Sequence, residues 1–231
     1  MLRALIWDVD GTVAETERDG HRVAFNQAFE AAGLAWVWDV VLYGRLLQVS
    51  GGRERLLAFM QGRSDAPATA EARDGLARQL HARKNAFYAE LVAQGRIVAR
   101  PGVHRLMDEC EQHGIALAVA TTTSRSNVEA LFTSLFGSGW PKRFAAVVCA
   151  EDAPLKKPDP QAYHRVLQRL GLAPGEAFAL EDSPQGLQAA RAAGLRCGIT
   201  RSAYFLQAGF EGAAWVRDDL ESPTPLHLAH I

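Results

Sequence analysis

The sequence has few cysteines, almost no net charge and no long apolar run. The three cysteines lie far apart, without the Cys/His spacing of a zinc site. We expect Cys149 and Cys197, which lie in apolar strand-like runs, to be buried free thiols of a reducing compartment. The formal net charge of -1 provides no basic field for nucleic acid or an anionic membrane.

The N-terminal stretch MLRALIWDVDG runs directly into a charged motif, without the apolar region of a signal peptide. No apolar stretch approaches the length that spans a bilayer. We therefore expect a cytoplasmic protein without nucleic-acid or membrane partners, and we expect it to be a monomer. Its 231 residues suffice for one large domain or two small ones.

Five short apolar runs alternate with helical patterns along most of the chain. They cover residues 4–7, 115–120, 145–149, 177–180 and 195–200. Runs that are apolar on both faces are typical of parallel strands covered by helices on each side. Pro101 and Pro184 are each predicted to begin a helix. The alternation predicts an α/β fold with a doubly wound, mostly parallel, Rossmann-like sheet.

Residues 16–96 interrupt this alternation, because they contain no convincing strand. Helical patterns cover residues 18–32, 40–48 and 54–61, and a longer one lies within 70–94. We therefore predict an all-helical cap domain over residues 16–96, inserted into a core made of residues 1–15 and 97–231.

A polar cluster follows each of the first four apolar runs. Ligands of open α/β sheets bind outside the carboxyl ends of the strands, so the four clusters are expected to converge on one crevice. The clusters are Asp8-Val9-Asp10-Gly11-Thr12, Thr121-Thr122-Thr123-Ser124-Arg125, Lys156-Lys157-Pro158-Asp159 and Glu181-Asp182-Ser183.

The first cluster places two carboxylates, those of Asp8 and Asp10, close together. Asp8 and Asp10 point to the same face of an extended chain, and two neighbouring carboxylates repel unless a cation or a shared proton stabilises them. Together with Glu181 and Asp182 they supply the hard oxygen ligands that Mg²⁺ prefers. Hydroxyls and a lysine in the other clusters complete an inventory for phosphoryl transfer.

The motifs DVDGT, ATTTS, KKPDP and EDS, in this order and after these strands, resemble the four signatures of the haloacid dehalogenase superfamily. The resemblance covers almost the whole chain, and the helical block resembles the small cap of that superfamily. It implies a phosphoric monoester hydrolase that uses Mg²⁺ and an aspartyl-phosphate intermediate. Dehalogenases of the superfamily lack the second acid, so Asp10 favours phosphoryl chemistry.

The resemblance also implies a role for each motif residue. Asp8 is the nucleophile and Asp10 the general acid and base. Thr121 and Lys157 stabilise the transferring phosphoryl group. The implied metal ligands are Asp8, Asp10 through its backbone carbonyl, Asp182 and, directly or indirectly, Glu181. Further contacts to the substrate are expected from Thr122, Thr123 and Arg125.

Within the superfamily, ETERDGHRVAFNQAF and WDVVLYGRLLQVSGGRERL resemble the CbbY-like subfamily. That resemblance implies a small phosphorylated sugar as substrate, namely xylulose 1,5-bisphosphate, an inhibitor of Rubisco. Its 1-phosphate would be removed to give xylulose 5-phosphate, a reaction that serves the Calvin cycle.

A bisphosphate needs a second anion site, for which the cap offers arginines beside glycines. Glu17 and His21 are candidates for binding sugar hydroxyls. The expected anion site comprises Tyr43, Gly44, Arg45, Gly51, Gly52 and Arg53. Position 53 departs from the subfamily, in which lysine is frequent. As alternatives, Arg53 and Arg55 are exposed helix charges, and His21 and Tyr43 are packing residues.

Three other functions fit parts of the sequence. The signature motifs are shared with sugar-phosphate mutases of the β-phosphoglucomutase type and with broad-specificity sugar phosphatases, so these two remain open. A receiver-like phospho-switch also uses clustered acids, a Thr or Ser and a Lys. It is disfavoured because its phosphorylated Asp follows a later strand and no helical insertion follows its first.

Overall fold

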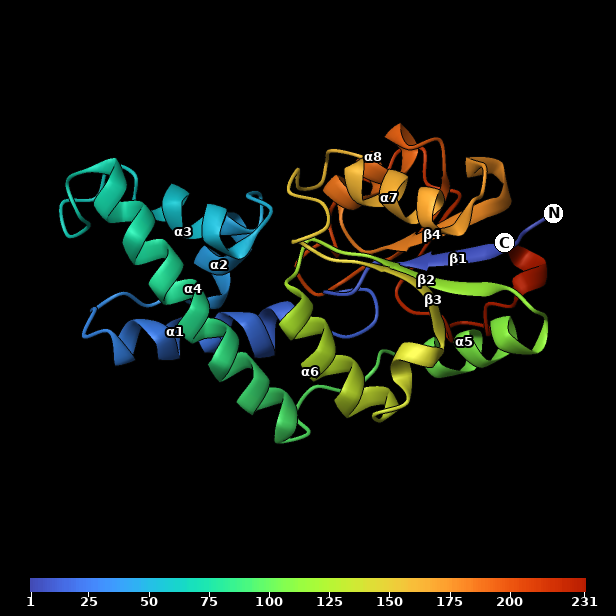
Figure 1. The fold of residues 1–231 in the computed structure, drawn as a ribbon, viewed down its shortest axis with the longest axis horizontal. Coiled ribbons are helices and arrows are strands. Elements are labelled where there is room, and N and C mark those ends of the chain that lie inside the picture. Colours follow the sequence, from blue (N-terminus) through green and yellow to red (C-terminus); the bar gives the residue numbers. More distant parts are fainter. The chain divides into compact units, whose positions relative to one another are not determined.

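The computed structural model of the protein describes residues 1–231, and six strands in it form one sheet (Figure 1). All neighbouring strands are parallel, in the order β3-β2-β1-β4-β5-β6. The strands are β1 (Ala4–Trp7), β2 (Ala116–Ala120), β3 (Phe144–Val148), β4 (Ala177–Glu181), β5 (Arg196–Thr200) and β6 (Trp215–Arg217).

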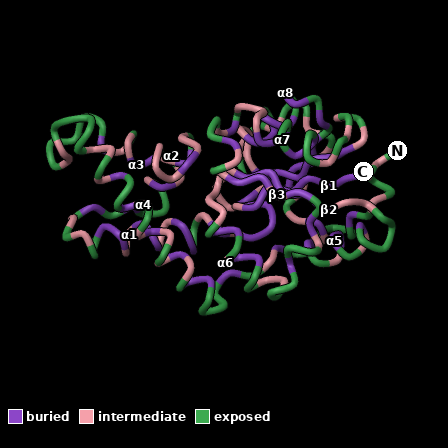
Figure 2. Tube along the Cα trace, viewed as in Figure 1, coloured by how far each residue is buried: buried purple, intermediate pink, exposed green.

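Helices cover both faces of this sheet. Figure 1 shows α7 (Gln161–Leu170) and α8 (Pro184–Ala192) on one face, and α5 (Val103–Gln112) and α6 (Arg125–Phe136) on the other. The core on the α7–α8 side includes Ile6, Ala118 and Ala179 of the strands and Val166 and Leu187 of the helices. The central strands are buried along their length (Figure 2). The predicted doubly wound α/β fold is confirmed.

One strand was missed in the sequence patterns, and one predicted helix start is wrong. Strand β6 was not predicted, because it has only three residues and lies at the sheet edge, where none of them is fully buried. Pro101 does not begin a helix: it lies in a turn, and α5 begins at Val103 after Gly102, whose φ of 82° is left-handed.

Other local predictions are confirmed. Helix α8 begins at Pro184, and the Ser183 side chain caps it by accepting a hydrogen bond from the Gly186 backbone N–H. All three cysteines are free and buried.

The contacts divide the chain into two compact units. We call Met1–Glu15 together with Val98–Ile231 the α/β unit, and Thr16–Ile97 the helical unit. The helical unit contains α1 (Arg22–Ala31), α2 (Val40–Leu46), α3 (Gly52–Met60) and α4 (Ala70–Ala93), preceded by a π-helical turn at Glu17–His21. None of the helices has the length and hydropathy needed to cross a bilayer.

Aromatic side chains form the core of the helical unit. The Phe29 ring lies edge-on to Trp36 and Trp38, with centroid distances of 5.7 and 5.0 Å. Phe25 and Phe59 contact the same Trp38 ring at 4.7 and 5.3 Å. Buried aromatic rings contribute large apolar areas, so this cluster gives the unit a hydrophobic core of its own.

Candidate active site

The polar clusters follow strands that lie side by side. Strand β1 lies between β2 and β4, with Trp7 opposite both Val119 and Leu180. The parallel register therefore brings Asp8, Thr121 and Glu181 out at the same edge of the sheet. This edge is the candidate active site.

Lys157 is the centre of a buried charge cluster in the α/β unit. Its Nζ lies 2.6 Å from Asp8 Oδ1 and 2.6 Å from Glu181 Oε1, and it donates to the Ala120 carbonyl at 2.8 Å. All three donor positions of the ammonium are thus used. Lys156, by contrast, donates to the Ala150 carbonyl at 3.2 Å.

The carboxylates in this cluster outnumber the lysine. Burial, reinforced by the charge of Glu181, raises the pKa of Asp8 to about 8, although Lys157 acts in the opposite direction. Burial and the charges of Asp8 and Glu181 raise the pKa of Asp182 well above its usual range. Burial would lower the pKa of Lys157, but the charges of Asp8 and Glu181 raise it, so the lysine stays protonated. The cluster therefore contains more carboxylates than one lysine can neutralise, and a bound cation would stabilise their ionised forms.

Asp8, Glu181 and Asp182 form the candidate metal site. Each offers one carboxylate oxygen, and these oxygens lie within 4.8 Å of one another. Glu181 is the most fully hydrogen-bonded of the three: its Oε1 accepts from Lys157 and from the Tyr163 hydroxyl at 2.6 Å, and its Oε2 accepts from the Asp182 N–H at 3.2 Å. An all-oxygen, carboxylate-rich set suits a hard divalent cation.

Ser202 holds Asp182 by a hydrogen bond, and two glycines leave the space that the carboxylates occupy. The Ser202 hydroxyl donates to Asp182 Oδ2 at 2.5 Å. A Cβ on Gly11, whose φ is +91°, would lie 2.1 Å from Asp182 Oδ2, and a Cβ on Gly186 would lie 1.9 Å from Glu181 Oε2. Both positions therefore need glycine because a carboxylate approaches the backbone closely.

Sequence reasoning missed Tyr163, Ser202 and Gly186 as parts of the site. Tyr163 lies shortly after the KKPDP motif, but nothing in the sequence connects its hydroxyl to Glu181. Ser202 follows the fifth apolar run, so the rule that located the other four clusters would have identified it.

The threonine-rich loop after β2 is held by its own hydrogen bonds. Thr121 is buried, and its hydroxyl accepts from the Thr123 N–H at 3.2 Å. Asn127 Nδ2 donates to the Thr123 hydroxyl at 3.0 Å, and Ser124 caps α6. Thr122 is half-buried.

Two predicted residues near this edge are more exposed. Arg125 donates from its guanidinium to Asp152 Oδ2 at 2.6 Å, so its charge is already paired. Asp10 is half-buried, and its charge contributes to the raised pKa of Asp8.

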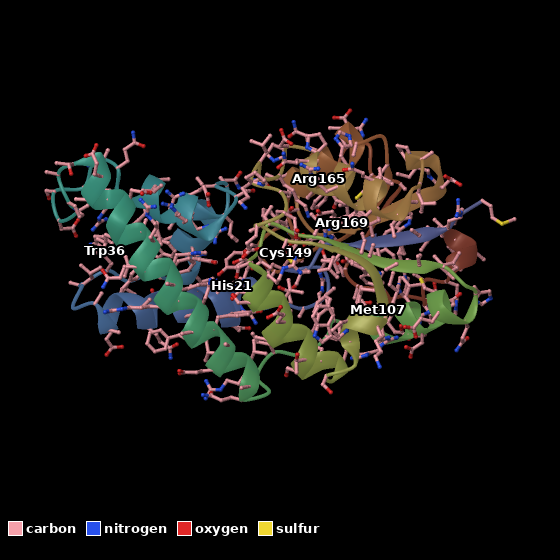
Figure 3. The ribbon with its side chains drawn as sticks, viewed as in Figure 1. His21, Trp36, Met107, Cys149, Arg165 and Arg169 are labelled. Atoms are coloured by element: carbon pink, nitrogen blue, oxygen red, sulfur yellow. The ribbon has the colours of Figure 1, made fainter.

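In the helical unit, Glu17 and Tyr43 belong to a second polar cluster. The Tyr43 hydroxyl donates to the Glu17 carboxylate, and Arg55 Nη1 donates to the Tyr43 oxygen at 2.8 Å. Arg55 is buried, so the idea that it is an exposed helix charge is wrong. His21, labelled in Figure 3, is buried in the helical unit. Its ring stacks on the Tyr88 ring with a centroid distance of 4.2 Å.

The predicted anion-site residues lie on or beside α2 and α3. Arg45 is exposed on α2, one residue after the half-buried Gly44. Arg53 on α3 forms an ion pair with Asp74, which neutralises part of its charge. Gly51 precedes α3 with a φ of 91°, and a Cβ on Gly52 would lie 2.9 Å from the His81 ring.

Sequence comparisons agree with the motif analysis. The sequence model of the haloacid dehalogenase-like hydrolases matches residues 2–194. Protein CbbY, plasmid, of Cupriavidus necator is 43% identical over 100% of this chain and 90% of its own length. A CBBY-like protein of Arabidopsis thaliana is 35% identical over 95% of this chain and 70% of its own length.

Comparison with solved structures also finds a CbbY protein. CbbY from Rhodobacter sphaeroides in complex with phosphate has a TM-score of 0.91 and 39% identity, covering 100% of this chain and 99% of that one. The D10N mutant of the same protein, in complex with xylulose-(1,5)bisphosphate, has a TM-score of 0.92 and 38% identity with the same coverage.

Proposed function

Because the chain belongs to the haloacid dehalogenase-like hydrolases, we propose that it is a Mg²⁺-dependent sugar phosphatase that removes the 1-phosphate of xylulose 1,5-bisphosphate. The substrate rests on one observation: a relative 38% identical over the whole chain has been crystallised with xylulose-(1,5)bisphosphate. The chemistry rests on the buried cluster of Asp8, Lys157, Glu181 and Asp182. The products would be xylulose 5-phosphate and inorganic phosphate.

Asp8 is the proposed nucleophile. One of its carboxylate oxygens attacks phosphorus in line, and the P–O bond to the sugar breaks with its electron pair going to the sugar oxygen. Asp10 gives that oxygen a proton. Asp10 then takes a proton from water, the water oxygen attacks the aspartyl phosphate, and phosphate leaves as Asp8 is regenerated.

Lys157 prepares the nucleophile. It holds Asp8 Oδ1 at 2.6 Å, so the orientation of the carboxylate is fixed before substrate binds. The same ammonium offsets charge that develops on the phosphoryl group, and Thr121 offers a hydroxyl to its oxygens. A divalent cation bound by Asp8 and Asp182, with Glu181 in support, would reduce the repulsion between the carboxylates and the phosphate.

We propose the helical unit as the source of the second anion site. Arg45 is exposed and suited to a terminal phosphate, whereas Arg53 would have to share its guanidinium with Asp74. Arg45→Ala and Arg53→Ala should lower kcat/KM for the bisphosphate more than for xylulose 1-phosphate, which has the scissile phosphate but lacks the second one. Arg63→Ala, which removes an exposed charge paired with Asp65, is the matched control. Unchanged kcat/KM in both test variants would reject this anion site.

The proposed function is tested by a phosphate-release screen over sugar mono- and bisphosphates. We expect Mg²⁺-dependent release with a strong preference for xylulose 1,5-bisphosphate over ribulose 1,5-bisphosphate, lost in Asp8→Asn. A preference for monophosphates would indicate a broad-specificity phosphatase and overturn the substrate. Conversion of β-glucose 1-phosphate to glucose 6-phosphate with little free phosphate would indicate a mutase. Size-exclusion chromatography and cell fractionation would test the expected cytoplasmic monomer.

A further inference from the structure

Arg100 is a buried cation of the α/β unit that the proposed mechanism does not use. Only 9% of the residue is exposed, and it lies where the chain re-enters this unit, directly before the turn that leads to α5. Burying a guanidinium is costly unless its N–H groups find acceptors. Its contacts therefore indicate which segments depend on it.

The guanidinium binds three segments that are far apart in the sequence. Nη1 donates to the carbonyl of Gly11 and, at 2.9 Å, to that of Thr200. Nη2 donates to the carbonyl of Arg201 at 2.8 Å and to that of Asp218. Its Nε lies 3.8 Å from the Glu15 carboxylate. The acceptors are therefore mostly main-chain oxygens, which hold the backbone itself in place.

Two of these segments carry parts of the active site. Gly11 directly follows Asp10, and it lies so close to Asp182 that a Cβ would clash. The Thr200–Arg201 segment leads to Ser202, whose hydroxyl donates to Asp182 at 2.5 Å. Arg100 therefore connects the loop of the proposed general acid to the segment that holds a proposed metal ligand.

The third segment is the C-terminal stretch, residues 218–231, for which the sequence indicates no function. Its anchor beside Arg100 is the hydrogen bond from the Leu220 N–H to the Pro101 carbonyl at 3.2 Å. Arg105 attaches the same stretch to α5, since its Nη2 donates to the carbonyls of Leu220 and Leu226 at 3.0 and 2.9 Å. None of the hydrogen bonds of Arg105 reaches the Gly11 loop. Replacing Arg105 therefore weakens only the attachment of the C-terminal stretch, whereas replacing Arg100 also releases the Gly11 loop.

We propose that Arg100 is a positioning residue, which aligns the Asp10–Gly11 loop with the Thr200–Ser202 segment and so fixes the proposed general acid relative to Asp182. This inference rests on the proposed phosphatase function. The planar guanidinium is required because it donates to four carbonyls from two nitrogens, whereas a lysine ammonium has three donors at one point.

The test compares Arg100→Met and Arg100→Lys with Arg105→Met. A misplacement of about 1 Å in an active site can lower a rate by about 100-fold. We therefore expect Arg100→Met to lower kcat by about 100-fold with KM changed less than about threefold, and Arg100→Lys to recover about tenfold of that loss. Arg105→Met should lose stability but keep kcat within about twofold of wild type.

Two measurements exclude a merely structural effect. Activity is measured well below the Tm of each variant, and the Mg²⁺ concentration that gives half of the maximal increase in Tm is determined without substrate. This concentration should rise in Arg100→Met but not in Arg105→Met, because only Arg100 aligns the segments beside Asp182.

Equal kcat and equal Mg²⁺ response in Arg100→Met and Arg105→Met would overturn the inference. If Arg100→Met fails to fold, Arg100→Lys decides, and wild-type kcat in that variant would also overturn it. If the wild-type protein releases no phosphate from any sugar phosphate, the proposed function fails, and the Mg²⁺ response alone then decides the role of Arg100.

Discussion

Gly11→Ala is the substitution whose effect follows most directly from the geometry of the site. The new Cβ would lie 2.1 Å from Asp182 Oδ2 and 3.1 Å from the Ser202 Cβ. Since carbon and oxygen prefer a separation of roughly 3.5 Å, Asp182 would have to move by about 1 Å or more. Alanine would also have to adopt a φ of +91°, which costs about 1–2 kcal/mol.

These two effects can be separated with Gly171→Ala as the control. Gly171 has a φ of +64° at the end of α7, and nothing lies within 4 Å of the position that a Cβ would take. Gly171→Ala should therefore lose about 1–2 kcal/mol in the free energy of unfolding, measured by urea denaturation, and Gly11→Ala should lose more because of the clash. Only Gly11→Ala should also lose about 100-fold in phosphate release and bind Mg²⁺ more weakly. Wild-type turnover in Gly11→Ala would refute the reasoning from the close contact.

Three further predictions concern the charge cluster. Tyr163→Phe removes the 2.6 Å hydrogen bond to Glu181 and should lower the free energy of unfolding by about 1–3 kcal/mol in urea titrations; unchanged stability would contradict the assigned bond. Lys157→Met leaves two buried carboxylates without their cation. It should therefore abolish turnover and lower the free energy of unfolding by about 3–5 kcal/mol, and a stable, active variant would contradict the proposed role of Lys157. In the metal-free protein the pKa of Asp8, about 8, exceeds its unfolded value, so its contribution to stability is present at low pH and is lost as pH rises toward 8. Because Mg²⁺ must displace that proton, the Mg²⁺-induced rise in Tm should grow between about pH 6 and pH 9, and a pH-independent rise would exclude this linkage.

The fold could be predicted because its signals are local. Apolar runs mark β1 to β5, and glycine, proline and serine mark the helix ends, as at Ser183-Pro184. Strand β6 was not predicted because Trp215–Arg217 is too short to show a periodicity and pairs with β5 alone. The start of α5 was misplaced because Pro101 is compatible with both a turn and a first helical turn.

The site was predictable only as far as topology determines it. The rule that ligands bind at the carboxyl ends of parallel strands is enough to bring Asp8 and Glu181 to one edge. Contacts made by helix side chains do not follow from that rule. Tyr163 on α7, Arg55 on α3 and Arg100 before α5 each find partners that depend on how their elements pack.

The position of β1 in the sheet has a consequence for how the chain folds during translation. Strand β1 is central in the sheet and is synthesised before both of its neighbours, since Ala4 pairs with Ala116 and Ala177. The apolar residues of β1 therefore have no neighbouring strands to pair with until most of the polypeptide has been synthesised. The helical unit, continuous from Thr16 to Ile97, has no such dependence and can collapse earlier. The nascent chain would then carry an already folded helical segment while the apolar residues of β1 are still unpaired.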